Sequence, residues 1–213
     1  MAKFKLLVTA GPTREMLDPV RFLSNVSTGH MGYAVAREAR KMGCDVTLIS
    51  GPTALVQPRG IKFVAVTSAQ DMKRAIARIW SRADGLIMTA AVCDYTPAHF
   101  SRQKIKRVRQ KTVHFKRTPD ILKYFGARKH RQLTVGFCLE TENVMANAKR
   151  KLRGKNLDYI VANWYRPGHN PFGTHQASMV LLGRGGARVH FPGTVKSRTA
   201  RRLLRVVLAG RGI

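Results

Sequence analysis

Acidic residues are scarce in this chain. Its 213 residues include 39 lysines and arginines but only 11 aspartates and glutamates, which leaves a formal charge of +28. No acid follows Asp158. This imbalance excludes an acidic disordered tail and an ordinary neutral surface. It favours an anionic partner: nucleic acid, an anionic membrane surface or phosphorylated small molecules.

Cysteine is scarce as well. Cys44, Cys93 and Cys138 lie far apart and form no CxxC pair. Their number and spacing exclude a disulfide framework and a cysteine zinc site. Each lies in an apolar segment, so we expect buried free thiols. The seven histidines show no metal-ligand spacing, and we predict surface or capping roles for them.

Long apolar runs are missing too. None approaches the roughly 18 residues that span a bilayer. The N-terminal residues carry charge and only a short apolar stretch, which is typical of a first strand rather than of a signal peptide. We therefore expect a cytoplasmic protein without a membrane partner.

The apolar content of 44% is sufficient for a sizeable core, and the simplest organisation is a single domain over residues 1–213. Short apolar runs alternate with amphipathic helical segments. We expect strands at about 4–10, 45–50, 61–66, 85–91, 133–139 and 157–163, and helices at about 29–42, 69–82, 118 onward and 143–152. This alternation predicts an α/β fold: a Rossmann-like three-layer sandwich with a mostly parallel central sheet.

The pattern changes in the last part of the chain. Two apolar runs at 178–182 and 187–191, joined by a glycine-rich turn, predict an antiparallel hairpin. A closing helix follows at about 197–209, so hairpin and helix together occupy about 176–210. Helix caps are expected at Ser68 and at Thr118, the latter with Pro119 at the first helical position.

Two connections are too long for simple turns. They run over about 11–28 and 97–117, each after the carboxyl end of a strand, where open α/β sheets bind ligands. In the first, Ser27, Thr28 and Gly29 lead directly into a helix, an arrangement that favours a phosphate. The alternative interpretation of these three residues is an ordinary helix cap. Asn25, just upstream, is then an ordinary turn residue. Glu15 and Asp18 are either a metal pair or partners of a nearby arginine.

Several blocks of the sequence are similar to one family. The stretch LVTAGPTREMLDPVRFLSNVSTGHMGYAVA closely resembles the start of phosphopantothenoylcysteine synthetase, the ligase of coenzyme A biosynthesis. TAAVCDYTP, KIKR, TPDIL, VGFCLETEN and KNLDYIVAN resemble the family's AAVADY, KxKK, NPDIL, VGFAAETEN and KNLDLIVAN, in the family's order. Seven of the 11 acids fall inside these blocks, which predicts that the chain keeps its carboxylates near the site.

The resemblance implies a nucleotide site. Its residues are a strand-end segment, an acid beyond it, a helix start, an aromatic residue and two lysines: Met88, Thr89, Ala90, Asp94, Pro119, Asp120, Ile121, Leu122, Phe137, Lys151 and Lys155. The region 97–117 carries eight cations and no acid, and it is similar to a flap whose Lys104 meets phosphates over the nucleotide. Asn25 resembles the residue that engages the acyl-nucleotide intermediate. The alternatives for the aromatic residue and the two lysines are a core position and a solvated face.

The resemblance also implies a chemistry. The carboxylate of 4′-phosphopantothenate would attack the nucleotide α-phosphate, and the amino group of L-cysteine would then attack the acyl-nucleotide. The blocks look bacterial, which implies CTP rather than ATP, with Mg²⁺ or Mn²⁺ and a homodimer. No metal ligands are identified. The chain departs from the family at Thr118, where the family has Asn, and at Arg107, where it has Lys. It lacks the flavin-dependent decarboxylase domain often fused to bacterial members, so we expect a stand-alone synthetase.

Two other functions are alternatives to the ligase. A nucleic-acid-binding protein on the same fold would use the +28 charge and the arginines of the last helix, in unspecific contacts. Against it, no RNA- or DNA-binding signature is present and aromatic residues make up only 8%. An NAD(P)-dependent oxidoreductase is disfavoured because GxGxxG is absent.

Overall fold

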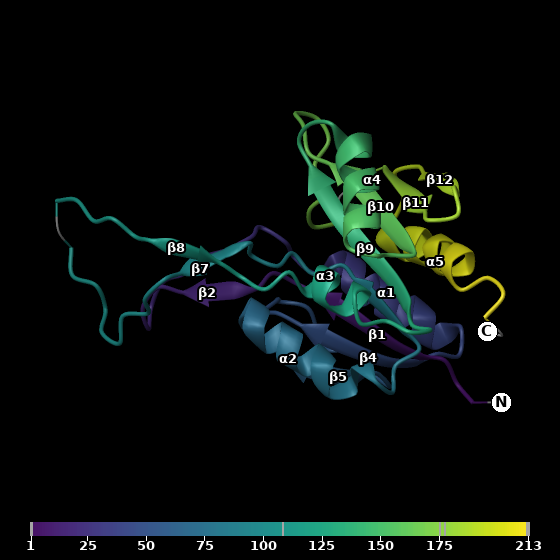
Figure 1. Ribbon diagram of the computed structural model, residues 1–213, viewed down its shortest axis with the longest axis horizontal. Coiled ribbons are helices and arrows are strands. Elements are labelled where there is room, and N and C mark those ends of the chain that lie inside the picture. Colours follow the sequence, from purple (N-terminus) through teal and green to yellow (C-terminus); the bar gives the residue numbers. More distant parts are fainter. Residues whose placement is uncertain (1, 108, 175, 177, 212–213) are drawn as a thin grey trace.

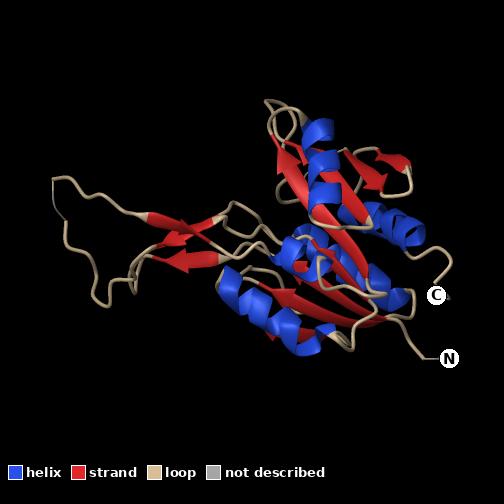
Figure 2. Ribbon diagram, viewed as in Figure 1, coloured by secondary structure: helices blue, strands red, loops and turns tan. Residues whose placement is uncertain are grey.

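One eight-stranded sheet organises the molecule (Figures 1 and 2). The computed structural model describes residues 2–107, 109–174, 176 and 178–211. The strands lie in the order β12-β11-β10-β9-β6-β1-β4-β5. Their bounds are β1 Lys5–Ala10, β4 Asp45–Ser50, β5 Lys62–Ala65, β6 Gly85–Met88, β9 Leu133–Glu140, β10 Tyr159–Trp164, β11 Met179–Gly183 and β12 Arg188–Phe191.

The strand order is that of a Rossmann-like sheet. From β1, the chain adds β4 and β5 on one side and then β6, β9 and β10 on the other, and all of these pairs are parallel. The order reverses between β1 and β6, where open α/β sheets bind ligands at the carboxyl ends of their strands. β11 and β12 continue the sheet as an antiparallel hairpin. The predicted fold class is confirmed, although β6 ends at Met88, earlier than expected.

Helices cover both faces of the sheet and complete the three layers. α1 and α5 share one hydrophobic core with the sheet, and α2, α3 and α4 share the other. The bounds are α1 His30–Lys41, α2 Ala69–Trp80, α3 Ile121–Gly126, α4 Val144–Gly154 and α5 Lys196–Val207. All three cysteines are buried free thiols, as predicted. Within the described residues, none of the helices has the length and apolar character needed to cross a bilayer.

Of the two predicted helix caps, one is confirmed and the other is wrong. Ser68 caps α2 in a capping box with Asp71, as expected. Thr118 does not cap α3, and Pro119 is not its first residue: Asp120 is the cap, and its side chain accepts a hydrogen bond from the Lys123 amide. The Thr118 hydroxyl instead donates to the Cys93 carbonyl oxygen at 2.6 Å. Thr118 therefore joins two loops, and the carboxylate two residues later satisfies the helix start.

The two long connections contain strands that the sequence did not indicate. β2 (Arg14–Met16) pairs with β3 (Phe22–Ser24), and β7 (Tyr95–Pro97) pairs with β8 (Phe115–Arg117). Together they form an arm that extends from the carboxyl edge of the sheet, away from the two termini (Figure 1). The flap predicted over 97–117 is the distal part of this arm. The arm strands have only three residues each, too few for a periodic signal.

A buried carboxylate joins the two helices of one face. Glu38 of α1 accepts hydrogen bonds from Lys41 Nζ at 2.8 Å and from Arg201 Nε of α5 at 2.7 Å. Burial raises the pKa of this carboxyl, but the hydrogen bonds and charges of the two cations outweigh it and lower the pKa below 4.5. Both cationic side chains are more than half exposed, at 62% for Lys41 and 53% for Arg201.

We expect Glu38→Gln to lower the free energy of unfolding by about 1–3 kcal/mol at pH 7, because two charge-assisted hydrogen bonds are lost while the exposed cations regain water. The wild-type advantage should shrink as pH falls through the lowered pKa, since protonation removes the same charge. Urea unfolding between pH 3 and 7 measures both effects.

The matched control is Lys62→Ala, which breaks the exposed Lys62–Asp45 pair and should cost less than about 1 kcal/mol. Equal losses in the two variants, or a gap that does not change with pH, would contradict the assignment.

Candidate active site

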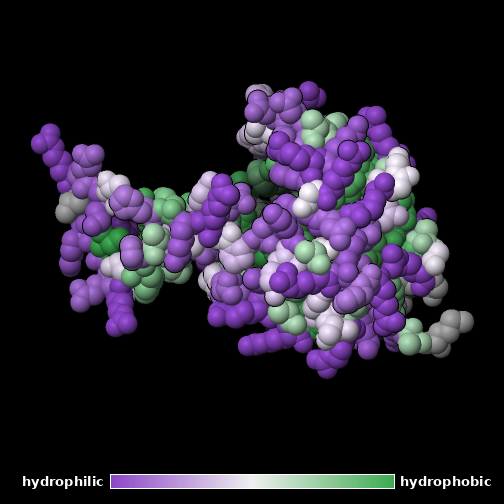
Figure 3. Space-filling view, viewed as in Figure 1, coloured by the Kyte–Doolittle hydropathy of each residue, from purple (hydrophilic) through white to green (hydrophobic). Residues whose placement is uncertain are grey.

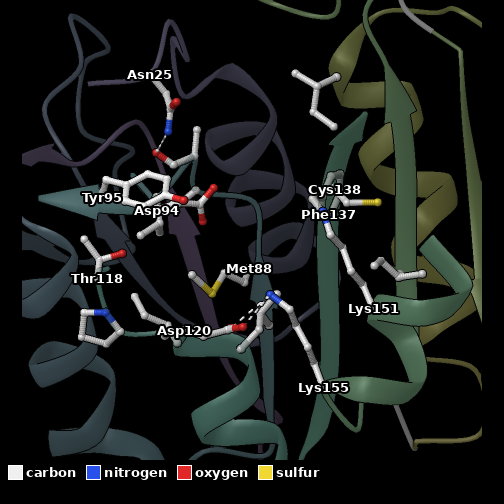
Figure 4. Close-up of a pocket in the computed structure, with 18 of the residues that line it drawn as sticks. Asn25, Met88, Asp94, Tyr95, Thr118, Asp120, Phe137, Cys138, Lys151 and Lys155 are labelled. Atoms are coloured by element: carbon white, nitrogen blue, oxygen red, sulfur yellow. Dashed lines mark hydrogen bonds and ion pairs between the residues drawn. The ribbon is translucent and has the colours of Figure 1, made fainter. Parts of the chain in front are cut away.

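A cavity of about 620 Å³ opens at the carboxyl ends of β6 and β9 (Figure 4). Eleven of the sequence-predicted site residues line it: Asn25, Met88, Ala90, Asp94, Pro119, Asp120, Ile121, Leu122, Phe137, Lys151 and Lys155. They come from blocks far apart in the sequence, which the parallel sheet brings to one edge. The roles assigned to them remain predictions.

One wall of the cavity is charged. Lys155 Nζ lies 3.0 Å from Asp120, the residue that caps α3, and Lys151 Nζ lies 2.6 Å from Glu140 Oε1 at the end of β9. Lys151 lies on α4 and Lys155 is the residue that directly follows it, and both side chains project toward the cavity (Figure 4). Each lysine holds a carboxylate in this structure, and an anionic ligand would compete with these carboxylates for the ammonium groups.

The opposite wall is built from the segment that follows β6 and from the first connection. Asn25 Nδ2 donates a hydrogen bond to the Ala91 carbonyl oxygen at 3.0 Å (Figure 4). The amide oxygen of Asn25 takes no part in this bond. Asp94 and Tyr95 follow on the same side, and Tyr95 is half exposed. This wall offers an amide, a carboxylate and a phenol across from the two lysines.

One cysteine lines the cavity, and its thiol is not a nucleophile at neutral pH. Cys138 of β9 lines the floor and is 8% exposed. Burial, as the largest cause, raises the pKa of this thiol to about 11. The thiol is therefore protonated and has the character of a packing residue.

Three predicted loop residues and Thr89 lie in a neighbouring pocket of about 60 Å³. We call it the α1–α5 pocket; its lining is Ser27, Thr28, Gly29, His30, Met31, Gly32, Thr89, Pro171, Phe172, Gly173 and Lys196. Phe172 lines both spaces, so the two are neighbours. Gly29 precedes α1 at φ 81°, which glycine adopts without strain. A Cβ on Gly32 would lie 2.5 Å from Ala10 Cβ, so only glycine lets α1 approach β1 this closely.

Lys104 does not line the cavity. It lies on the flap, where the backbone of the next residue is tied down: the Ile105 amide donates to Asp18 Oδ2 at 3.1 Å, and Arg21 Nη2 donates to the Ile105 carbonyl oxygen at 2.7 Å. The Arg21 guanidinium lowers the pKa of buried Asp18 far below its usual range, against the effect of burial. Of the two alternatives for Asp18, the arginine partner is therefore correct.

The carboxylates are not concentrated at the site, contrary to the prediction from their blocks. Of the acids that the structure describes, only Asp94 and Asp120 line the cavity. Glu15 accepts a hydrogen bond from the Ala69 amide at the start of α2, and Asp158 pairs with Lys129. Among the described residues, no group of three or more His, Cys, Asp and Glu side chains could hold a metal ion. Most of the acids stabilise the fold.

Sequence reasoning missed several residues of the cavity. Arg117 and Tyr95 lie at the ends of the arm strands, and Phe172 lies in the connection after β10. Tyr95 directly follows Asp94 inside a recognised block, so that block could have indicated it. Nothing in the sequence around Phe172 distinguishes it from a loop residue, because its place depends on how the connection folds back over α1.

Comparisons with known proteins agree with this architecture. The family described as "DNA/pantothenate metabolism flavoprotein C-terminal domain" matches residues 1–210. The coenzyme A biosynthesis bifunctional protein CoaBC of Bacillus subtilis is 43% identical over 189 residues, which cover 88% of this chain and 47% of that protein. The chain spans about half the length of the curated relatives it matches.

Solved structures give the same result. A crystal structure of the C-terminal domain of CoaBC has a TM-score of 0.82 and 39% identity, covering 96% of this chain and 93% of that one. A Cab2 mutant in complex with phosphopantothenate-cysteine has a TM-score of 0.75 at 14% identity, covering 97% and 85%, and shows the same fold. The resemblance drawn from the sequence blocks is thereby confirmed, and the chain belongs to the family of DNA/pantothenate metabolism flavoprotein C-terminal domains.

Proposed function

We propose that this chain ligates 4′-phosphopantothenate to L-cysteine through an acyl-nucleotide, giving 4′-phosphopantothenoylcysteine in coenzyme A biosynthesis. Family membership supports it, as does the printed name of the Bacillus subtilis relative, a coenzyme A biosynthesis protein. The observation that carries the proposal is the cavity, where separate family-like blocks supply one lining. The nucleic-acid-binding alternative is not favoured, because these findings concern coenzyme A biosynthesis.

The reaction has two steps. A carboxylate oxygen of phosphopantothenate attacks the α-phosphorus of the nucleotide, and the bond to pyrophosphate breaks. The cysteine amino group then attacks the acyl carbon, the nucleoside monophosphate leaves with the electron pair, and the amine loses a proton. The reactants are mostly polyanions, so the protein must offset their repulsion while it holds them together.

The residues of this chain suit that task. Lys151 and Lys155 would exchange Glu140 and Asp120 for phosphate oxygens, and Asp94 would accept hydrogen bonds from a ribose or a base. The Asn25 amide would bind the acyl-nucleotide. Lys104 would reach the phosphates when the flap closes over the cavity, which also excludes water.

The nucleotide is CTP in our proposal, from the bacterial appearance of the blocks, with ATP as the alternative. Mg²⁺, or Mn²⁺, would enter bound to the triphosphate. Mg²⁺ in nucleotide sites takes one or two carboxylates and substrate oxygens, and Asp94 or Asp120 fits that need. The ion supplies charge neutralisation of the leaving pyrophosphate.

We also propose a homodimer. Exposed large apolar side chains gather on the arm, where Figure 3 shows apolar residues beside hydrophilic ones: Val20, Phe22, Leu23, Tyr95, Phe100 and Phe115. Such patches mark protein interfaces. Among the described residues, no exposed large apolar side chain lies on β11 or β12. A cytoplasmic location stays a prediction.

The direct test incubates the protein with phosphopantothenate, cysteine, Mg²⁺ and either CTP or ATP. We expect pyrophosphate release and the ligated product by mass spectrometry, with CTP preferred, and much slower release by Lys104→Ala. Absence of pyrophosphate with every nucleotide would overturn the ligase proposal. Preference for ATP would overturn only the choice of nucleotide.

Lys155→Ala should raise the KM for the nucleotide about tenfold, because one charge-assisted hydrogen bond to phosphate is lost. Lys149→Ala is the matched control, since Lys149 lies on α4, the helix that ends just before Lys155, and is exposed away from the cavity lining. Equal effects of the two substitutions would assign the loss to overall charge rather than to the site.

Asn25→Ala should release pyrophosphate but accumulate bound acyl-nucleotide, detectable by mass spectrometry of the denatured protein. The reason is that the second step loses the amide that orients the intermediate. An unchanged melting temperature would show that the accumulation does not come from destabilisation of the fold by loss of the Asn25–Ala91 hydrogen bond. Normal product formation would remove Asn25 from the site.

A further inference from the structure

Asn25 and Asp94 lie on the same side of the cavity, and both belong to connections rather than to strands or helices (Figure 4). Asn25 directly follows β3, and Asp94 directly precedes β7. Backbone outside regular elements is fixed by individual hydrogen bonds. Asp94 is also exposed, so packing contributes little to its orientation. The geometry of this wall therefore depends on the bonds that hold its two connections.

One fully buried residue, Thr13, supplies bonds to both connections. Its hydroxyl oxygen accepts a hydrogen bond from the Cys93 amide at 3.0 Å, and Cys93 directly precedes Asp94. Its carbonyl oxygen accepts a hydrogen bond from the Ser24 hydroxyl at 2.8 Å, and Ser24 directly precedes Asn25. Two different atoms of Thr13 thus hold the residue next to the acid and the residue next to the amide.

Further bonds meet at the same place. The Thr13 amide donates to the Ala91 carbonyl oxygen at 3.3 Å, and Asn25 Nδ2 donates to that same oxygen at 3.0 Å. The Cys93 carbonyl oxygen accepts a hydrogen bond from the Thr118 hydroxyl at 2.6 Å. The segment after β6 is therefore held between two threonine hydroxyls, and Thr13 ties it to the connection that carries Asn25.

Burial makes the Thr13 hydroxyl difficult to replace. Thr13 is 0% exposed and Cys93 is 4% exposed, so water does not take the place of a lost bond between them. Without the hydroxyl, the buried Cys93 amide has no acceptor there, which favours a shift of the backbone toward another partner. Such a shift moves Asp94, because the two residues share a peptide bond. A misplacement of about 1 Å at a functional group is enough to impair binding or catalysis strongly.

We propose that Thr13 is a positioning residue of the active site, which places Asp94 through its hydroxyl oxygen and Asn25 through its carbonyl oxygen. The tasks of Asp94 and Asn25 rest on the proposed function, whereas the anchoring of their two connections does not. Since the two bonds use different atoms of Thr13, they can be removed separately, and each removal has its own expected result.

Thr13→Val removes the hydroxyl and keeps the carbonyl oxygen that Ser24 contacts. We expect the KM for CTP to rise about tenfold with kcat within threefold of wild type, because Asp94 is displaced from the nucleotide. Thr13→Ser retains the hydroxyl and should stay within twofold of wild type in both constants.

Ser24→Ala removes the other bond. It should leave the KM for CTP within twofold of wild type but accumulate bound acyl-nucleotide, as expected for Asn25→Ala, because Asn25 loses the anchor beside it. Steady-state kinetics and mass spectrometry of the denatured protein measure the two effects. If Thr13→Val does not fold, the result for Ser24→Ala supports or overturns the proposal by itself.

The matched control is Thr134→Val. Thr134 is also 0% exposed, and its hydroxyl oxygen accepts a hydrogen bond from the Asp158 amide at 3.3 Å. It lies near the start of β9, outside the cavity lining. Thr134→Val should lower the melting temperature without changing the KM for CTP.

Three outcomes would overturn the proposal. The first is an equal rise in the KM for CTP in Thr13→Val and Thr134→Val, which would assign the effect to general destabilisation. The second is a Thr13→Ser variant as impaired as Thr13→Val. The third is a Thr13→Val variant with a lower melting temperature and wild-type kinetics, which would make Thr13 purely structural.

Hydrogen–deuterium exchange tests the anchoring without any substrate. Amides of residues 92–94 should exchange about tenfold faster in Thr13→Val than in wild type, and those of residues 24–26 should do so in Ser24→Ala, because each segment opens more readily once its bond is lost. Unchanged exchange in both variants would overturn the anchoring. If the wild-type chain shows no ligase activity, this measurement still decides the anchoring, so the two proposals fail separately.

Discussion

Parallel pairing at the centre of the sheet is the constraint on which the rest of the molecule depends. β1 lies between β4 and β6 with all three strands in one direction, so every crossover must return over a face of the sheet. The strands then end at one edge, and the connections after β1, β6 and β9 meet there. The cavity, the α1–α5 pocket and the arm all lie at this edge because residues of those connections form them.

The scarcity of acids acquires a different meaning in the folded chain. Asp18 anchors the flap, Glu38 joins α1 to α5, and Asp158 holds Lys129. Two more carboxylates, Asp120 and Glu140, pair with the cavity lysines Lys155 and Lys151. With 39 cations and 11 acids, most positive charges have no partner, so a carboxylate is used where it satisfies backbone amides or a buried cation. The surplus cations lie mainly at the surface, where water solvates them.

The accuracy of the sequence-based prediction followed the length of the elements. The strands near 45–50 and the helix near 29–42 were placed almost residue by residue, because apolar periodicity over six to twelve residues reports burial directly. The arm strands were missed because three residues carry no period, and their pairing depends on two connections meeting in space. Thr118 and Asp120 both suit a helix cap locally, and only the contact of Thr118 with Cys93 decides between them.

The sequence by itself determined the fold class, the direction of the central strands and the family, since these depend on periodic burial and on long blocks of residues in a characteristic order. It also indicated most of the cavity lining, because those blocks lie at strand ends. Only the tertiary structure decided which groups contact one another: Lys151 with Glu140, Lys155 with Asp120, Asp18 with the Ile105 amide, and Lys196 with the Pro171 carbonyl oxygen. Such pairs join residues brought together by parallel crossovers, and their distance along the chain leaves no local signal.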